Sequence, residues 1–175
     1  EYLKIKIKNL NEKYGHGEPI FYLFLRNRIW NESESKAIEW ERKRGKIVEF
    51  NRLLRGDKDT TYEYVDCPDN IMKSIRYVVT IDHNELLPKT SVKRLIAAIC
   101  HPLNQPQVNI KKNVVSYGYG MIQPHVTAAV SLEKSIFERS LFGESGWDPY
   151  NSISSNLSQD LFGYSLFLGK GIYDV

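Results

Sequence analysis

Residues 75–88 read "IRYVVTIDHNELLP", an apolar run that ends on an aspartate and then turns polar. The part "IRYVVTID" (75–82) lacks strict alternation of apolar and polar side chains, so it predicts a strand that is covered on both faces. Four polar residues follow its expected end, namely Asp82, His83, Asn84 and Glu85. Such a group forms either a ligand site at a sheet edge or an ordinary capping turn.

Asp82 and Asn84 have the spacing that a shared ligand requires. Residues i and i+2 of an extended segment point the same way, so these two side chains could meet one cation. Magnesium on a nucleotide diphosphate is typically held by one or two carboxylates together with the phosphates. The tetrapeptide alone leaves the metal site and the capping turn both open.

The bulk composition indicates a globular domain and excludes several classes of protein. The chain has 175 residues, 42% hydrophobic and 26% charged, which is enough for one domain with a real core. A net charge of +3 is too small to indicate a nucleic-acid partner. These residues show neither a signal-peptide pattern nor an apolar run of the roughly 18 residues that span a bilayer. Cys67 and Cys100 lack CxxC spacing, which argues against a zinc site or a disulfide scaffold and favours a reducing cytosol.

The order of predicted elements indicates the fold class. Strands are expected at 20–30, 75–82 and 114–126, and helices at 35–56, 89–104 and 127–143. The helix at 89–104 has an apolar stripe of Val92, Leu95, Ile96 and Ile99. This alternation predicts crossover connections and a layered α/β sheet. Ligands of such sheets bind at the carboxyl ends of strands, where Asp82 is expected.

The predicted helix at 35–56 carries an apolar stripe of Ile47, Phe50 and Leu54. Gly45 costs about 1 kcal/mol relative to alanine inside a helix, so it could mark a break between two helices. Basic residues also crowd this segment, and such a run is usually a solvated face, with Glu41 and Glu49 as local partners.

Two polar residues of the same segment, Lys46 and Asn51, stand among apolar neighbours that are expected to be buried. A lysine in that position could reach a phosphate. The spacing alone does not decide between this role and a solvated one.

Other candidate motifs are weak when taken singly. Lys170 lies between Gly169 and Gly171, which suits either close approach to an anion or a tight turn, and the pattern is not a Walker motif. Gln159 and Asp160 stand in a polar segment whose default interpretation is a surface loop. The sequence has no HExxH, GxSxG or GxGxxG motif, which argues against a zinc hydrolase, a serine hydrolase and a dinucleotide fold.

Taken in order, several segments resemble the processive glycosyltransferase region of cyclic β-1,2-glucan synthases, from about residue 18 onward. The resemblance rests on "FYLFLRNRIWN", "WERKRGKIVEFNRLLRG", "RYVVTIDHNELLP", "LIAAICHPLNQP", "YGYGMIQPHV", "WDPYNSISSNLSQDLFG" and "GKGIYDV". It implies a GT-A-type α/β/α fold, UDP-glucose as donor, Mg²⁺ or Mn²⁺ as cofactor, and a growing β-1,2-glucan as acceptor.

The resemblance also assigns roles to residues. Asp82 falls on the first aspartate of a DxD-like metal motif, and the chain departs from that motif by having Asn84 in place of its second aspartate. The remaining assigned residues are expected near donor or acceptor: Lys46 and Asn51 of the "GKxxxLN" pattern, Gln123, Gln159, Asp160, and Gly169, Lys170 and Gly171.

The resemblance further implies that residues 1–175 are one partial glycosyltransferase domain of a larger membrane enzyme. Its expected parts are an N-terminal segment (1–17), a strand and helix core (18–143) and substrate-side loops (144–175). The family's general base and membrane helices would lie beyond Val175, so the chain alone is expected to be inactive. This soluble part of the enzyme is expected at the cytoplasmic face of the bacterial inner membrane. Two alternatives remain open, a non-catalytic glycosyltransferase-like scaffold and a nucleic-acid binder, of which the second is disfavoured.

Overall fold

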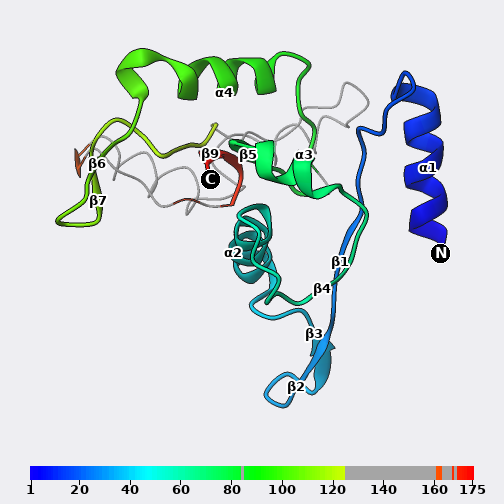
Figure 1. Cartoon of the computed structure of the whole chain (residues 1–175). Helices are drawn as coiled ribbons and strands as arrows, with labels where there is room; N and C mark the ends of the chain where they lie inside the picture. Colours follow the sequence, from blue (N-terminus) through cyan, green and yellow to red (C-terminus); the bar gives the residue numbers. More distant parts are fainter. Residues whose placement is uncertain (84, 125–160, 163–166, 168) are drawn as a thin grey trace, which may run out of the picture. The chain divides into compact units, whose positions relative to one another are not determined.

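The computed structural model describes residues 1–83, 85–124, 161–162, 167 and 169–175 (Figure 1). The chain divides into two compact units, Glu1–Arg76 with Val175, and Tyr77–Asp174. Both units combine helices with small antiparallel sheets. The observed mixture agrees with the predicted α/β class, although the described strands form four small sheets and not one layered sheet.

The first unit contains three helices and four strands. Its elements are α1 (Tyr2–Tyr14), β1 (Phe24–Arg26), β2 (Ile29–Asn31), β3 (Lys36–Ile38), α2 (Arg42–Leu54), β4 (Tyr62–Val65) and α3 (Asp69–Ser74). Strands β1 and β4 form one antiparallel pair, and β2 and β3 form another.

An aromatic cluster joins α2 to the β1–β4 pair. The ring of Phe24 on β1 lies 5.2 Å from Phe50 on α2 and 6.1 Å from Tyr62 on β4, in edge-to-face contacts. Edge-to-face aromatic pairs add stability beyond the area that they bury. Leu54, at the end of α2, is fully buried.

The strand predicted at 20–30 is wrong in its extent, because two short strands occupy this segment. The break lies at residues 27 and 28, between β1 and β2. After β2 the chain turns at Asn31, whose Oδ1 accepts hydrogen bonds from Ser33 Oγ at 2.7 Å and from the Glu34 amide at 3.2 Å. An asparagine that bonds the backbone just ahead of it initiates a turn. The chain therefore folds back as the β2–β3 hairpin and leaves Trp30 exposed.

The helix predicted at 35–56 is also shorter than expected, because it begins at Arg42. Gly45 does not break it but lies buried in its first turn. A Cβ on Gly45 would stand 2.1 Å from the carbonyl oxygen of Trp40 and 2.8 Å from its Cε3. Glycine is needed here so that Trp40 can pack against the helix.

The described residues of the second unit include a three-stranded sheet, the helix α4 and a hairpin. Its described elements are β5 (Tyr77–Thr80), α4 (Ser91–Cys100), the 3₁₀ helix η1 (Pro102–Asn104), β6 (Gln107–Asn109), β7 (Val114–Tyr117), β8 (Met121–Ile122) and β9 (Gly171–Asp174). The sheet order is β5-β9-β8, while β6 pairs with β7.

Both neighbours of β9 run antiparallel to it, so β5 and β8 run parallel to each other. Helix α4 lies in the connection between these two parallel strands, as the crossover prediction required. Strand β9, from the end of the sequence, inserts between them.

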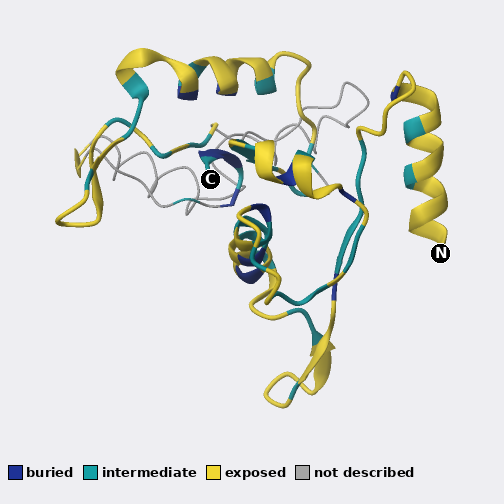
Figure 2. Cartoon of the chain, viewed as in Figure 1, coloured by how far each residue is buried: buried dark blue, intermediate teal, exposed yellow. Residues whose placement is uncertain are grey.

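The core of this unit lies between α4 and one face of the sheet (Figure 2). Leu95 and Ile99 of α4 pack with Ile172 of β9, and Tyr77, Val79 and Ile122 surround them. Leu95 and Ile99 confirm the stripe expected for 89–104, but Ile96 of that stripe is exposed. Tyr173, on the opposite face of β9, is also buried and contacts Phe167.

The last two predicted elements differ in their outcome. The strand predicted at 114–126 is divided into β7 and β8 around Gly118, whose φ is +74°. The helix predicted at 127–143 lies outside the described residues.

Replacing Gly45 by alanine is expected to destabilise the fold by about 1–3 kcal/mol, because the new methyl group meets the backbone of Trp40. The direction of the change tests the packing, because glycine to alanine in an exposed helix interior would raise the free energy of unfolding by up to about 1 kcal/mol. Urea unfolding measures the effect. Gly120→Ala is the control because a Cβ there meets nothing within 4 Å. A Gly45→Ala protein as stable as the wild type would contradict this packing.

Candidate functional site

Three segments that are far apart in the sequence meet at one end of the β5-β9-β8 sheet. Thr80, at the carboxyl end of β5, pairs with Gly171, and Ile122, at the end of β8, pairs with Ile172. Asp82 lies two residues beyond the end of β5, Gln123 directly follows β8, and Lys170 directly precedes β9. The sheet therefore brings three of the predicted site residues to the same edge.

Each of the two glycines that flank Lys170 is required for a structural reason of its own. Gly169 is buried and has a φ of +77°, which glycine adopts without strain. Gly171 has a φ of +155°, and a Cβ there would lie 2.4 Å from the Ile122 carbonyl oxygen and 2.8 Å from Gln123 Cα. The "GKG" segment thus packs its backbone against the end of β8, and Lys170 supplies its side chain.

The Lys170 ammonium group meets two carboxylates. Its Nζ lies 2.5 Å from Glu85 Oε1 and 3.7 Å from Asp82 Oδ2. All three side chains are partly covered, and that of Asp82 keeps 35% of its surface exposed. The group is a compact cluster of one cation and two anions at the edge of the sheet, with a carboxylate that solvent and ligands can reach.

Glu85 also closes the turn after β5. The Asp82 amide donates a hydrogen bond to Glu85 Oε2 at 2.9 Å. Burial raises the pKa of Glu85, but the Asp82 amide and the Lys170 ammonium outweigh it and hold the pKa below its ordinary value. The capping turn that the sequence left open is therefore present, made by Glu85, while the Asp82 carboxylate points to Lys170.

Asp82 has the chemistry of a cation ligand, since it is an ionisable carboxylate that remains partly exposed. Asn84, the other predicted ligand, lies outside the described residues. Within the described part of the chain, no group of three or more His, Cys, Asp or Glu side chains is arranged to hold a metal ion. The assignment of Asp82 and Asn84 as metal ligands stays a prediction.

Lys46 and Asn51 lie on α2, in the other compact unit. The expectation that these two residues stand among buried apolar neighbours is wrong, because Ile47 and Phe50 are half-buried and Val48 is exposed. The Lys46 side chain is 56% exposed, and its Nζ pairs with Glu39 Oε2 at 3.5 Å. Asn51 is half-buried. Glu49, expected as a surface partner of the basic residues, is instead buried against Arg26, with 2.7 Å between Oε2 and Nη2.

The remaining predicted residues, Gln159 and Asp160, lie outside the described residues. The contact that sequence reasoning missed is the Lys170–Glu85 ion pair. The two segments carry opposite charges and each contains turn residues, but only the insertion of β9 beside β5 brings them together.

Both cysteines are free, and Cys67 is buried whereas Cys100 is exposed. Among the described helices, none has the length and apolar character that crossing a membrane requires.

Comparison with known proteins supports the resemblance drawn from the motifs. No family model matches the chain. The chain is 38% identical, over 178 aligned residues that cover all of it, to the cyclic beta-(1,2)-glucan synthase NdvB of Rhizobium meliloti (strain 1021). It spans 6% of the length of that protein. The resemblance to cyclic β-1,2-glucan synthases is therefore confirmed along the whole chain, as homology to one segment of a much larger synthase.

The Glu85 contacts predict a specific dependence of stability on pH. A carboxyl group whose pKa is lowered on folding contributes stability above its ordinary value of 4.5, and this contribution is lost as the pH falls through the lowered pKa. We expect Glu85→Gln to be less stable than the wild type at neutral pH, and the difference to shrink below pH 4.5. Urea unfolding across an acid pH series measures it, with the exposed Glu63→Gln as control. Parallel stability curves for wild type and Glu85→Gln would contradict the assigned ion pair.

Proposed function

We propose that the chain is part of a glycosyltransferase of the GT-A type that polymerises glucose from UDP-glucose into β-1,2-glucan. Its identity to a cyclic β-1,2-glucan synthase over the whole chain supports the reaction class. The β5–α4–β8 crossover, with Asp82 at the carboxyl end of β5, is consistent with a site at the edge of an α/β sheet.

The observation that carries the proposal is the meeting of Asp82 and Lys170 at this edge. Transfer of glucose from UDP-glucose releases a diphosphate, whose negative charge must be offset as the sugar bond breaks. A lysine ammonium is a strong point-charge partner for a phosphate. We propose that Lys170 pairs with the donor diphosphate and exchanges the Asp82 and Glu85 carboxylates for it.

Asp82 and Asn84 would hold Mg²⁺ or Mn²⁺ in this proposal. The exposed part of the Asp82 carboxylate fits a site with one carboxylate and the donor phosphates as ligands. When bound, the cation supplies further positive charge to the departing diphosphate. Asn84 offers one neutral oxygen, so the pair holds a cation more weakly than two aspartates do.

The other assigned residues complete the proposal. Gln123 lies beside Gly171 at the same edge and would face the substrate cleft. The exposed Lys46 and the half-buried Asn51 would contribute from α2 on the nucleotide side. Gln159 and Asp160, with Gly169 and Gly171, would line the donor or acceptor site.

We further propose that the general base and the membrane helices belong to other parts of the synthase. An inverting transferase needs a base to deprotonate the acceptor hydroxyl, and the proposed roles in this chain do not include one. The chain alone would then transfer no glucose. The whole enzyme would work at the cytoplasmic face of the inner membrane.

The direct test is donor binding by the full-length protein, measured by calorimetry with UDP-glucose and Mn²⁺. Asp82→Ala should weaken donor binding roughly 10- to 100-fold, because it removes a charged ligand worth about 1.5–3 kcal/mol. Asp59→Ala, a fully exposed carboxylate of the other unit, is the matched control and should bind as the wild type does.

Equal donor affinity for Asp82→Ala and the wild type would disprove the assigned role. Asn84→Asp in the same assay separates an active site from a scaffold. A modest rise in Mn²⁺ affinity fits a working site, whereas metal binding only in Asn84→Asp fits a decayed, non-catalytic module.

A further inference from the structure

A hollow of about 590 Å³ lies between the β2–β3 hairpin and the start of α2, within the first unit. It is lined by Ile29, Trp30, Asn31, Glu32, Glu34, Ile38, Trp40, Glu41 and Arg42. We call it the tryptophan groove. Its size is within the usual range for small-ligand sites.

Two indole rings give the groove its character. Trp30 is 64% exposed and Trp40 is 43% exposed. Tryptophan joins a large apolar face to a single N–H donor, and it is enriched where one side of the ring contacts a partner. Both indoles line the same hollow, so a ligand in it can contact two aromatic side chains.

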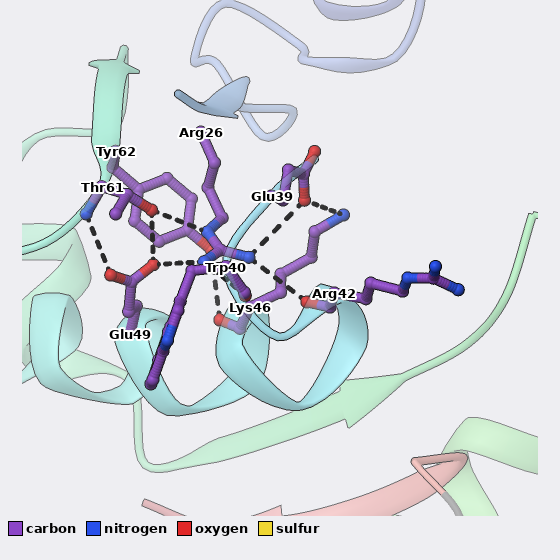
Figure 3. A network of polar contacts seen from close by, with 8 residues as sticks. All are labelled: Arg26, Glu39, Trp40, Arg42, Lys46, Glu49, Thr61 and Tyr62. Atoms are coloured by element: carbon purple, nitrogen blue, oxygen red, sulfur yellow. Dashed lines mark hydrogen bonds and ion pairs between the residues drawn. The ribbon is translucent and has the colours of Figure 1, made fainter. Parts of the chain in front are cut away.

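Trp40 is held in place by a buried arginine (Figure 3). The Arg26 side chain is 1% exposed, and its Nη2 donates to the Trp40 carbonyl oxygen at 3.0 Å while Nη1 donates to that of Arg42 at 3.2 Å. Gly45 leaves room for Trp40 on the other side, as described above. Two hydrogen bonds from Arg26 to the backbone, together with packing against Gly45 of α2, thus fix the position of Trp40 in the groove.

Arg26 is itself anchored by a closed polar network. Its Nη2 lies 2.7 Å from Glu49 Oε2, and its Nε donates to Thr61 Oγ1 at 2.9 Å. The Thr61 amide and hydroxyl both donate to Glu49, at 3.0 and 2.6 Å. Burial raises the pKa of Glu49, but these Thr61 bonds and the guanidinium group keep it below its ordinary value, so the anion persists. A fully partnered buried charge pair rigidifies its surroundings.

The charges of the groove indicate what it accepts. The lining carboxylates are balanced by ion pairs, because Glu34 pairs with both Arg42 and Lys36, and Glu41 pairs with Arg44. Because each of these cations already pairs with a carboxylate, the lining favours a neutral ligand over an anion. Carboxylate and amide oxygens accept hydrogen bonds from hydroxyl groups. The groove therefore combines apolar ring faces with hydrogen-bond acceptors, which suits a neutral ligand that is rich in hydroxyl groups.

We propose that the tryptophan groove binds a neutral β-linked glucan chain, with a glucose ring stacked on Trp30 and its hydroxyl groups bonded to the neighbouring carboxylates. A glucose ring has apolar C–H faces and a rim of hydroxyl groups, which matches this lining. The inference rests on the proposed function, because the glucan is the product assigned to the synthase. It adds a subsite for the product chain on a surface separate from the Asp82 edge in sequence and compact unit.

The test is hydroxyl-radical footprinting of the full-length protein, read at single residues by mass spectrometry, with short β-1,2-linked gluco-oligosaccharides as the probe. Oxidation of Trp30 should fall roughly two-fold or more at saturation, because a stacked sugar covers one of the two faces of the indole. Tyr2, which is 69% exposed and outside the groove, is the internal control and should not change. In Trp30→Ala, the protection of Trp40 should be lost, and in Trp30→Phe it should persist in part.

Unchanged oxidation of Trp30 at saturating oligosaccharide would overturn the inference. Low oxidation of Trp30 without the sugar would also overturn it, because another part of the protein would then occupy the groove. UDP-glucose added in a parallel sample reports on the peptides around Asp82 and Lys170. Their protection without that of Trp30 rejects only the glucan subsite, whereas no protection by UDP-glucose rejects the proposed function.

Discussion

The insertion of β9 between β5 and β8 is the constraint on which the candidate site depends. The antiparallel ladder sets Gly171 opposite Thr80, and this register brings the Lys170 ammonium group to Asp82 and Glu85. A slip of one residue would turn every side chain of β9 to the other face of the sheet. Ile172 would then leave the core beneath α4, so hydrophobic burial and the placement of Lys170 are fixed by the same register.

The main ion pairs of the two compact units differ in how far they are buried. In the first unit the Arg26–Glu49 pair is buried and surrounded by hydrogen bonds, so it organises the backbone around Trp40. In the second unit the ion pairs of Lys170 stay partly exposed, so a competing anion can replace the carboxylates at modest cost. The buried pair therefore suits a rigid lining of the tryptophan groove, and the partly exposed cluster suits a site whose lysine exchanges one anionic partner for another.

Local sequence patterns predicted part of this arrangement. The stripe of Leu95 and Ile99 indicated α4, and the change from apolar to polar residues placed Asp82 after a strand, because both signals are local. The division of residues 20–30 into two short strands was missed, because the aromatic run in this segment resembles a single buried strand. The partner of Lys170 could not be predicted, because it depends on strand pairing across 85 or more residues of sequence. Gly45 was misjudged because helix propensity says nothing of a tryptophan that packs against it.

A cryo-electron microscopy structure of the full-length protein with UDP-glucose and Mg²⁺ tests the central claim most directly. The account predicts the cation about 2.0–2.1 Å from an Asp82 carboxylate oxygen. It also predicts the Lys170 ammonium group turned from Glu85 to the diphosphate. A donor bound elsewhere, with Lys170 still paired to Glu85 and Asp82, would contradict it.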